Sequence, residues 1–227
     1  MVLNIKDISK SYNKGQLSVL SHINLQVQAG EFICLMGQSG SGKSTLMHIM
    51  GGLDTPDHGE VFFAGKSLSK LTDTEMSLIR RTQMGFIFQF FNLLPTMTAL
   101  ENVMLPALID GAEFSKAERR AYELLDLMEM KDRAGHRPAE LSGGQMQRVA
   151  IARSLFSQPK LILADEPTGN LDSKTGENVL NLLKKINQEF KQTLIMVTHD
   201  SKAASYASRI IRLSDGKIVG DTQEKLQ

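Results

Sequence analysis

Residues that could do phosphate chemistry gather in one stretch of the chain, FICLMGQSGSGKSTLMHIMG, at 32–51. A short apolar run there passes into glycines and serines and then into apolar residues at helical spacing. Gly37, Gly42, Lys43 and Ser44 fit G-x-x-x-x-G-K-[ST], the phosphate-binding loop between a strand and a helix. Glycines let backbone N–H groups surround an anion, and the following helix adds its positive N-terminal end. The stretch therefore predicts a nucleotide-phosphate site.

Two side chains of this loop have distinct predicted roles. We expect Lys43 to reach the β- and γ-phosphates and the Ser44 hydroxyl to ligate Mg²⁺. The alternative is a surface loop rich in glycine and serine with an incidental lysine. A chance match somewhere in a chain of this length arises roughly once in a hundred sequences of average composition, and the strand-then-helix context lowers that further.

A second set of candidates ends the run KLILADE, residues 160–166, whose apolar residues predict a buried strand. Asp165 at its end suits coordination of Mg²⁺ through water. Glu166 beside it can orient or deprotonate an attacking water. The structural alternative for two adjacent acids is a solvated helix cap leading into Pro167, but the phosphate loop upstream favours the catalytic interpretation.

The composition is that of an ordinary soluble globular protein, with 227 residues, 41% hydrophobic and 22% charged. The net charge of +1 disfavours a dedicated nucleic-acid surface, so we expect no nucleic-acid partner. No apolar stretch approaches the length that spans a bilayer, and the N-terminus lacks the apolar region of a signal peptide. We therefore expect a cytosolic location. Cys34, the single cysteine, is predicted to be a buried small hydrophobe.

Hydrophobic patterning supplies the elements that must position these residues. Alternation predicts two strands at 2–8 and 20–27, which would form a small antiparallel layer ahead of the phosphate loop. Apolar runs predict buried strands at 85–89, 160–166 and 193–198, and helical spacing predicts helices at 69–82, 116–130, 146–156 and 173–190. Asp215-Gly216 signals a two-residue hairpin. Strands alternating with helices indicate an α/β fold whose parallel sheet is covered on both faces, with a mostly helical insert from about 90 to 158.

Three further features have more than one interpretation. Tyr12, in the polar segment SYNKGQ, either packs locally or stacks on adenine. Phe90, Phe91, Leu93 and Leu94 are either loop residues tucked into the core or a docking patch for a partner. Ser142-Gly143-Gly144-Gln145 places small residues, with free N–H groups and a hydroxyl, before a helix and predicts a second anion-binding device.

The motifs in order resemble the ATP-binding cassette family. The pentapeptide LSGGQ at 141–145 has the phosphate loop upstream and LILADEPTGNLD downstream, and the resemblance covers essentially the whole chain. It implies a P-loop NTPase (RecA-like) core with an antiparallel β layer and a helical sub-domain. The chain would then be a single cassette ATPase domain, 1–227, with its core at 1–89 and 159–227 and its helical sub-domain at 90–158.

The resemblance also implies the site residues. Two copies would pair head to tail in an ATP-dependent homodimer, each ATP lying between one phosphate loop and the partner's LSGGQ. Tyr12 would stack on adenine, and the phosphates and Mg²⁺ would be held by Gly37, Gln38, Ser39, Gly40, Ser41, Gly42, Lys43, Ser44 and Thr45. Gln89 would reach the metal and the attacking water, and Asp165 would support Mg²⁺. Glu166 would be the general base, His199 would contact the γ-phosphate, and Asp172 would lie at the dimer seam. The γ-phosphate would be contacted across the dimer by Ser142, Gly143, Gly144 and Gln145.

The segments FQFFNLLPTMTALENVMLP and DEPTGNLDS resemble one branch of that family, the lipoprotein-releasing and macrolide- or peptide-exporting type. This implies an ATPase on the cytoplasmic face of the membrane that powers an integral membrane permease, docked near 90–105. An ATP-dependent cassette that regulates a membrane or cell-division complex without transport is the alternative. A soluble cassette acting on DNA or ribosomes would need a second cassette, a long coiled-coil insertion or a basic stripe, and a GTPase would need an Asn-Lys-x-Asp motif. We assign no role to Asn170.

Overall fold

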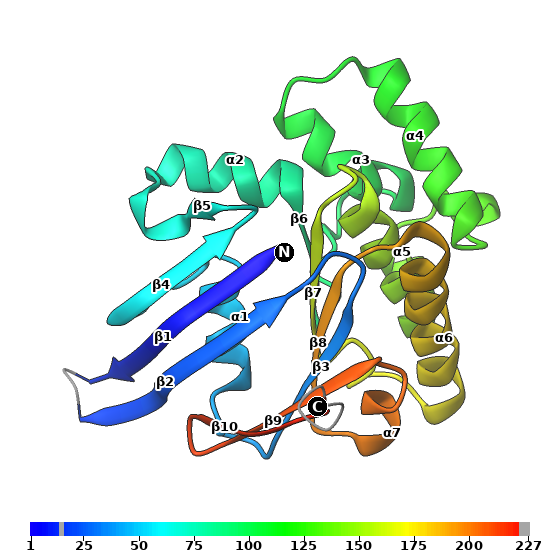
Figure 1. Cartoon of the computed structure of the whole chain (residues 1–227). Helices are drawn as coiled ribbons and strands as arrows, with labels where there is room; N and C mark the ends of the chain where they lie inside the picture. Colours follow the sequence, from blue (N-terminus) through cyan, green and yellow to red (C-terminus); the bar gives the residue numbers. More distant parts are fainter. Residues whose placement is uncertain (14–15, 223–227) are drawn as a thin grey trace.

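Two β-sheets and a set of helices make up the computed structural model, which describes residues 1–13 and 16–222 (Figure 1). A four-stranded sheet has the order β2-β1-β4-β5, and a six-stranded sheet has the order β10-β9-β3-β8-β7-β6. In the described ranges, no helix combines the length and the apolar character needed to cross a membrane.

The smaller sheet is the antiparallel layer that the sequence predicts. Its strands are β1 (Leu3–Tyr12), β2 (Leu17–Val27), β4 (His58–Phe63) and β5 (Lys66–Ser67). β1 lies in the middle, antiparallel to both β2 and β4. Both predicted strands are longer in the structure, and Tyr12 closes β1 instead of lying in a loop. The segment extends because Lys10, Ser11 and Tyr12 pair with β2, which overrides their polar composition.

The larger sheet positions the predicted phosphate chemistry. Its strands are β3 (Phe32–Met36), β6 (Met84–Ile87), β7 (Leu161–Asp165), β8 (Leu194–Thr198), β9 (Arg209–Ser214) and β10 (Lys217–Asp221). β3, β6, β7, β8 and β9 run parallel, and only the hairpin strand β10 is antiparallel. The hairpin at Asp215-Gly216 is confirmed, because both residues have positive φ, 46° and 71°. The carboxyl ends of parallel strands meet at one edge, where ligands bind in such folds.

The helices are α1 (Lys43–Met50), α2 (Asp73–Gln83), α3 (Ala99–Ile109), α4 (Phe114–Leu127), α5 (Gly143–Leu155), α6 (Ser173–Phe190) and α7 (Ser201–Ala204). Of the predicted helices, 173–190 is confirmed in both bounds. The predicted helix 69–82 is instead a 3₁₀ turn, Leu68–Lys70, followed by α2, which a Thr72–Glu75 capping box starts. The predicted helix 116–130 begins earlier and ends at Leu127, since Glu129 adopts a left-handed φ of 57°.

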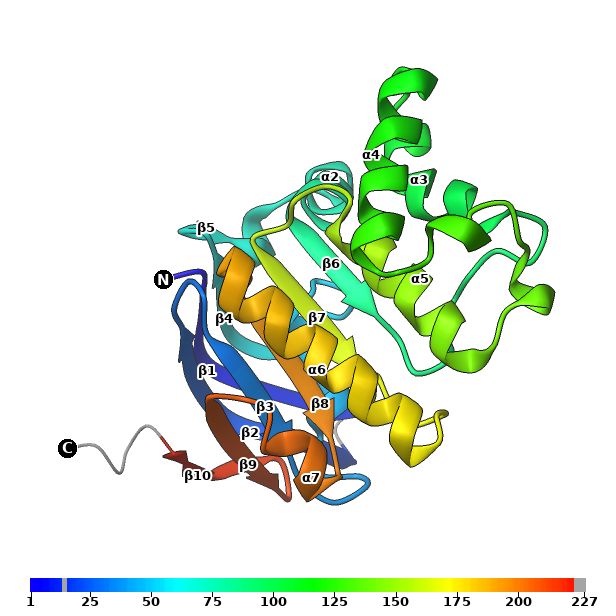
Figure 2. The ribbon, with the colours of Figure 1, turned by 90° about the vertical axis from the view of Figure 1, so that its right-hand side faces the viewer.

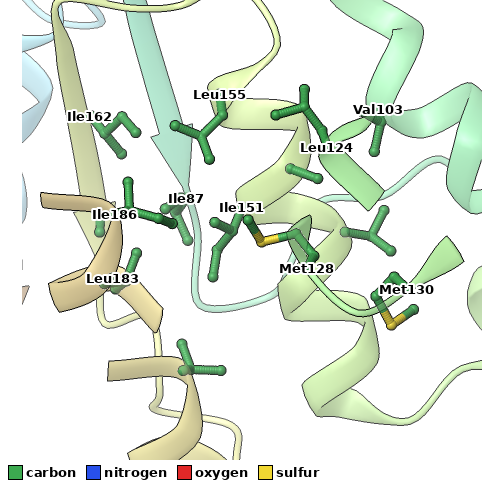
Figure 3. Close-up of a cluster of buried hydrophobic side chains, with 14 of the residues drawn as sticks. Ile87, Val103, Leu124, Met128, Met130, Ile151, Leu155, Ile162, Leu183 and Ile186 are labelled. Carbon is green, nitrogen blue, oxygen red and sulfur yellow. The ribbon is translucent and has the colours of Figure 1, made fainter. Parts of the chain in front are cut away.

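Each face of the larger sheet carries its own hydrophobic core. One core packs α1 and the antiparallel layer against the sheet, so strands as well as a helix cover this face. The other joins α3, α4, α5 and α6 to the sheet, and Figure 2 shows α6 lying across β7 and β8. In Figure 3 side chains from the helices and the sheet converge there, among them Leu124 of α4, Ile151 of α5, Leu183 of α6, Ile87 of β6 and Ile162 of β7. Cys34 is fully buried in this core, as predicted, and burial raises the pKa of its thiol to about 12.

Candidate nucleotide-binding site

The phosphate loop joins the end of β3 to the start of α1. Gly40 and Gly42 have φ values of 80° and 99°, a conformation that residues with a Cβ rarely adopt. Gly42 is the N-cap of α1 and offers no side chain to accept a hydrogen bond from the first turn. The first N–H groups of α1 therefore keep their hydrogen-bonding capacity for a ligand, at the positive end of the helix.

Close packing under the loop explains its first glycine. A Cβ added at Gly37 would lie 2.3 Å from the carbonyl oxygen of Leu213 and 2.6 Å from Ser41 Oγ, so no larger residue fits. Ser41 Oγ is buried and has no hydrogen-bond partner among the residues that the structure describes. A buried polar atom without a partner is costly, and a bound phosphate oxygen or its water would satisfy this one. The cradle thus fits a phosphate on the chain's own geometry.

Lys43 is folded back into the loop. Its ammonium donates a hydrogen bond of 2.7 Å to the carbonyl oxygen of Gln38, and only 6% of the residue is exposed. A buried ammonium with one neutral acceptor retains two donors and a charge. Phosphate oxygens would provide the charged partner that this lysine lacks.

Ser44 and Asp165 bring oxygen atoms together below the loop. Ser44 Oγ donates to Asp165 Oδ1 over 3.4 Å, although the two residues are 121 positions apart. Burial raises the pKa of Asp165, partly offset by the charge of His48, while the neighbouring Glu166 raises it further. A hydroxyl beside a half-buried carboxylate that is destabilised by burial suits a hard divalent cation such as Mg²⁺.

Glu166 follows β7 directly and sits in a strained backbone conformation, with φ of 41°. Its N–H donates to the carbonyl oxygen of Val197 over 3.0 Å, which holds this turn against β8. One carboxylate oxygen lies 2.9 Å from His199 Nδ1, and the side chains of Glu166 and His199 are 24% and 65% exposed. The left-handed turn aims the carboxylate out of the sheet edge, and the pair with His199 fixes its direction.

Gln89 lies two residues beyond β6, not at the strand's end as its predicted strand implies. Its Nε2 donates to Asn170 Oδ1 over 3.4 Å, and Asn170 Nδ2 donates to the Gln89 carbonyl oxygen over 3.0 Å. A Cβ at Gly169 would lie 2.8 Å from Gln89 Nε2. Asn170, to which sequence reasoning gives no role, thus fixes the predicted water-positioning glutamine, and a polar amide in a loop carries no pattern that would reveal this.

Many residues of this site line a cavity of about 1240 Å³. Its lining combines the phosphate loop with residues from the ends of β8 and β9, including Lys43, Ser44, Glu166, His199 and Arg212. Tyr12, Gln89 and Asp165 do not line it, although Asp165 contacts Ser44 there. A second cavity, of about 600 Å³, lies at the opposite strand ends between α4 and α6 and contains none of the predicted site residues.

The LSGGQ segment lies elsewhere. Ser142, Gly144 and Gln145 line a separate hollow of about 270 Å³ beside α6. The helix here begins at Gly143, not at Met146 as predicted, because Ser142 and Gln145 form a capping box. The Ser142 hydroxyl accepts from the Gln145 N–H over 3.3 Å, so neither group is free as the sequence suggested. Asp172, the predicted seam residue, is exposed and caps α6 by accepting from Thr175 N–H over 3.1 Å.

Comparison with known proteins identifies the family. The sequence profile described as ABC transporter matches residues 20–169. This chain belongs to the ABC transporter family. The ABC cassette is similar to a lipoprotein-releasing system ATP-binding protein LolD from Geobacter metallireducens, with 50% identity over 97% of this chain and 99% of that protein. It is 46% identical to a macrolide export ATP-binding/permease protein MacB from Brucella melitensis, over 99% of this chain but only 35% of that longer protein.

A solved structure places the same resemblance in three dimensions. The ATP-binding cassette MJ0796, in a dimeric post-hydrolysis state bound to ADP and Pi, matches with a TM-score of 0.87 and 45% identity over 96% of this chain and 97% of that one. The P-loop cassette fold predicted from the sequence is confirmed. The chain is an ATP-binding subunit of an ABC transporter, of the LolD and MacB type, and an ATPase that uses ATP and Mg²⁺.

Proposed function

We propose that this subunit powers an integral membrane permease that releases lipoproteins or exports macrolides or peptides, from the cytoplasmic face of the membrane. The observation that carries the proposal is the near full-length similarity to LolD, at 50% identity over 97% of the chain. The similarity to the ATP-binding part of MacB supports the same branch.

In this proposal the chain's own residues divide the work of hydrolysis. Mg²⁺, held by Ser44 and by Asp165 through water, would neutralise charge on the phosphates. Lys43 exchanges the Gln38 carbonyl for phosphate oxygens, and the amides of the phosphate loop and of α1 hold the rest of that charge. Glu166 accepts the proton of the attacking water. His199 keeps that carboxylate oriented through Nδ1 and leaves its other ring nitrogen for the γ-phosphate.

Gln89 would orient the same water, and Asn170 would limit how far the Gln89 side chain moves. In the structure Asn170 holds Gln89 by the two hydrogen bonds described above, and Gly169 packs against its amide. Because Asn170 belongs to the loop that leads to Asp172, movement at the seam between two copies would reach Gln89 directly. We propose Gln89 as a residue that contacts the metal and the attacking water, as the family resemblance implies.

We further propose a head-to-tail homodimer. Within one chain the LSGGQ residues line a hollow distinct from the phosphate cavity, so one copy does not close its own site. Gly143 and Gly144, at the start of α5, are partly exposed and Asp172, the N-cap of α6, is exposed. Gly144 packs against Thr175 in the first turn of α6, so these residues lie close together. A second copy would bring Ser142 to Gln145 over the phosphate loop, and the dimeric state of the similar cassette MJ0796 supports this arrangement.

The permease would dock on the segment 90–105. Phe90 is 73% exposed, whereas Phe91 and Leu93 are half-buried, which favours a docking patch over a fully buried loop. Arg153 of α5 donates to the carbonyl oxygens of Phe91 and Asn92 over 2.8 and 2.5 Å. Both of those residues have positive φ, 61° and 48°. The arginine thus holds a strained turn in place directly behind the exposed phenylalanine.

Purification of the tagged chain from detergent-solubilised native membranes, followed by mass spectrometry, tests the proposal. We expect a multi-span protein with a large extracytoplasmic domain to co-purify, and Phe90→Ala to reduce its recovery strongly. Recovery of ribosomal or DNA-repair proteins from the soluble fraction alone would contradict the transporter role. A membrane complex that stimulates ATP hydrolysis but moves no lipoprotein, macrolide or peptide in proteoliposomes would favour the regulatory alternative.

A further inference from the structure

Tyr12 ends β1 next to a small charged network. Its phenolic hydroxyl donates a hydrogen bond of 2.6 Å to Asp54 Oδ2. Asp54 lies in the loop after α1, 42 positions away, and its other carboxylate oxygen accepts from Lys10 Nζ over 2.8 Å and from the Thr55 N–H over 2.7 Å. One carboxylate thus joins β1 to the loop that follows the phosphate-binding helix.

Lys10 fixes the ring from a second direction. Its side chain is 10% exposed, and its ammonium lies 5.1 Å from the centroid of the Tyr12 ring and also donates to the Thr55 carbonyl oxygen over 2.6 Å. The cation covers one face of the ring by a cation–π contact. Tyr12 itself is 38% exposed. The open part of the ring is therefore held in one orientation, without the tyrosine being buried.

The titration behaviour of these groups agrees with the geometry. The hydrogen bond to Asp54 and burial raise the pKa of Tyr12, and a side-chain hydrogen bond with Thr45 of the phosphate loop partly lowers it. Burial alone would raise the pKa of Asp54, but hydrogen bonds from Lys10, Tyr12 and Thr55 hold it below its ordinary value. Asp54 is thus a stable anion at neutral pH, and Tyr12 lies beside Thr45.

We propose that Lys10 and Asp54 are positioning residues that hold the Tyr12 ring ready for the nucleobase of the bound nucleotide. The inference rests on the proposed function, in which Tyr12 stacks on adenine. A ring held in place before binding loses little conformational entropy on stacking, whereas a ring free to rotate loses more. Neither residue touches the phosphates in this arrangement, so the network adds affinity only for ligands that carry a base.

The test compares two ligands on the same protein. ATP and inorganic tripolyphosphate, each with Mg²⁺, are titrated calorimetrically into the wild-type chain and into Asp54→Ala, Tyr12→Phe, Tyr12→Ala and the Asp54→Ala/Tyr12→Phe double variant. Because stacking one base on an aromatic ring contributes about 1–3 kcal/mol, we expect Tyr12→Ala to weaken ATP binding about tenfold or more. Asp54→Ala and Tyr12→Phe should each weaken it about three- to fivefold, and the double variant should be no weaker than either. Tripolyphosphate affinity should stay within about twofold throughout, which also reports that the phosphate loop is folded.

Each contrary outcome has a separate meaning. If Tyr12→Ala binds ATP as tightly as the wild type, the adenine contact is absent and the inference fails with it. If Tyr12→Ala weakens ATP binding while Asp54→Ala does not, the stacking stands but the positioning role is overturned. Equal losses for ATP and tripolyphosphate in Asp54→Ala would also overturn it, since the carboxylate would then support the phosphate loop and not the ring. Multiplied losses in the double variant would contradict the proposed coupling.

Discussion

Two helices of this chain, α1 and α5, both have glycine and serine at their N-termini, but the two N-termini are capped differently. The N-cap of α1 is Gly42, which has a φ of 99° and no side chain to cap the first turn. The N-cap of α5 is Ser142, whose hydroxyl accepts from the Gln145 N–H, while Gln145 Oε1 accepts from the Ser142 N–H over 2.9 Å. The first helix thus leaves its amides for a ligand, and the second satisfies two of its groups internally.

The N-terminus of α1 also has a much larger cavity beside it than the N-terminus of α5 has. Beside α1, Lys43 and Ser41 are buried under a cavity of about 1240 Å³, and the Ser41 hydroxyl has no partner. Beside α5 the hollow is only about 270 Å³ and Ser142 is exposed. In the proposed arrangement a nucleotide would complete the first terminus within its own chain. The second terminus is capped internally and would present its surface to a second chain.

Among these variants, Lys43→Ala should cause the largest loss of ATPase activity, because it changes the phosphate loop before α1. The change removes the ammonium that reaches into the phosphate loop, and with it both binding and charge stabilisation. We expect kcat/KM for ATP to fall about a thousandfold, at the upper end for loss of one charge-stabilising donor. A steady-state phosphate-release assay measures this, and normal turnover would show that the loop is not the site.

Glu166→Gln should slow ATP hydrolysis in the phosphate cavity without weakening ATP binding. The amide keeps the shape and a hydrogen bond to His199 but cannot accept the water's proton. We expect kcat to fall about a hundredfold while ATP affinity is retained. Unhydrolysed ATP should then hold two copies together, which size-exclusion chromatography with light scattering detects. Ordinary turnover by this variant would remove Glu166 from the role of base.

How much of this could be read from the sequence differs between the two helices. The phosphate loop is predictable because its glycines act through backbone geometry and its lysine through a charged side chain, all at a fixed spacing along the chain. The start of α5 was misplaced by three residues, because glycines argue against a helix and only the Ser142–Gln145 capping box reveals that it has begun. Asn170 and Asp54 were missed altogether. Each acts through one tertiary contact with a distant residue, and no local pattern encodes such a contact.

Ser142→Ala tests whether the N-terminus of α5 is stabilised by its own cap. Loss of an N-cap hydroxyl lowers the free energy of unfolding by about 1 kcal/mol, which urea denaturation followed by circular dichroism measures. ATP affinity of the single chain should be unchanged, because Ser142 lies outside the phosphate cavity. Ser142→Asp, which keeps a capping oxygen, should restore the stability, whereas a matching loss would contradict the capping role.

Asp165→Asn should produce the smallest change, in thermal stability. Burial is the main cause that raises the pKa of Asp165 above its ordinary 3.8, so the folded chain binds this proton more tightly than the unfolded chain. Ionisation of Asp165 therefore opposes folding as pH rises through the folded-state pKa, and the cost is full at neutral pH. Without nucleotide we expect the variant to melt roughly 2 °C higher at pH 7, with the difference vanishing toward pH 3. A lower melting temperature at pH 7 would contradict this.

The central claim, that one site is built from the α1 terminus of one chain and the α5 terminus of another, is tested most directly by mixing two inactive variants. Lys43→Ala lacks a working phosphate loop, and Ser142→Arg lacks a working LSGGQ segment. Each alone should be inactive while melting cooperatively. A mixed pair contains one site with an intact loop and an intact LSGGQ segment, so ATP hydrolysis should reappear on mixing. A mixture that stays as inactive as its components, although light scattering shows that mixed dimers form, would contradict the account.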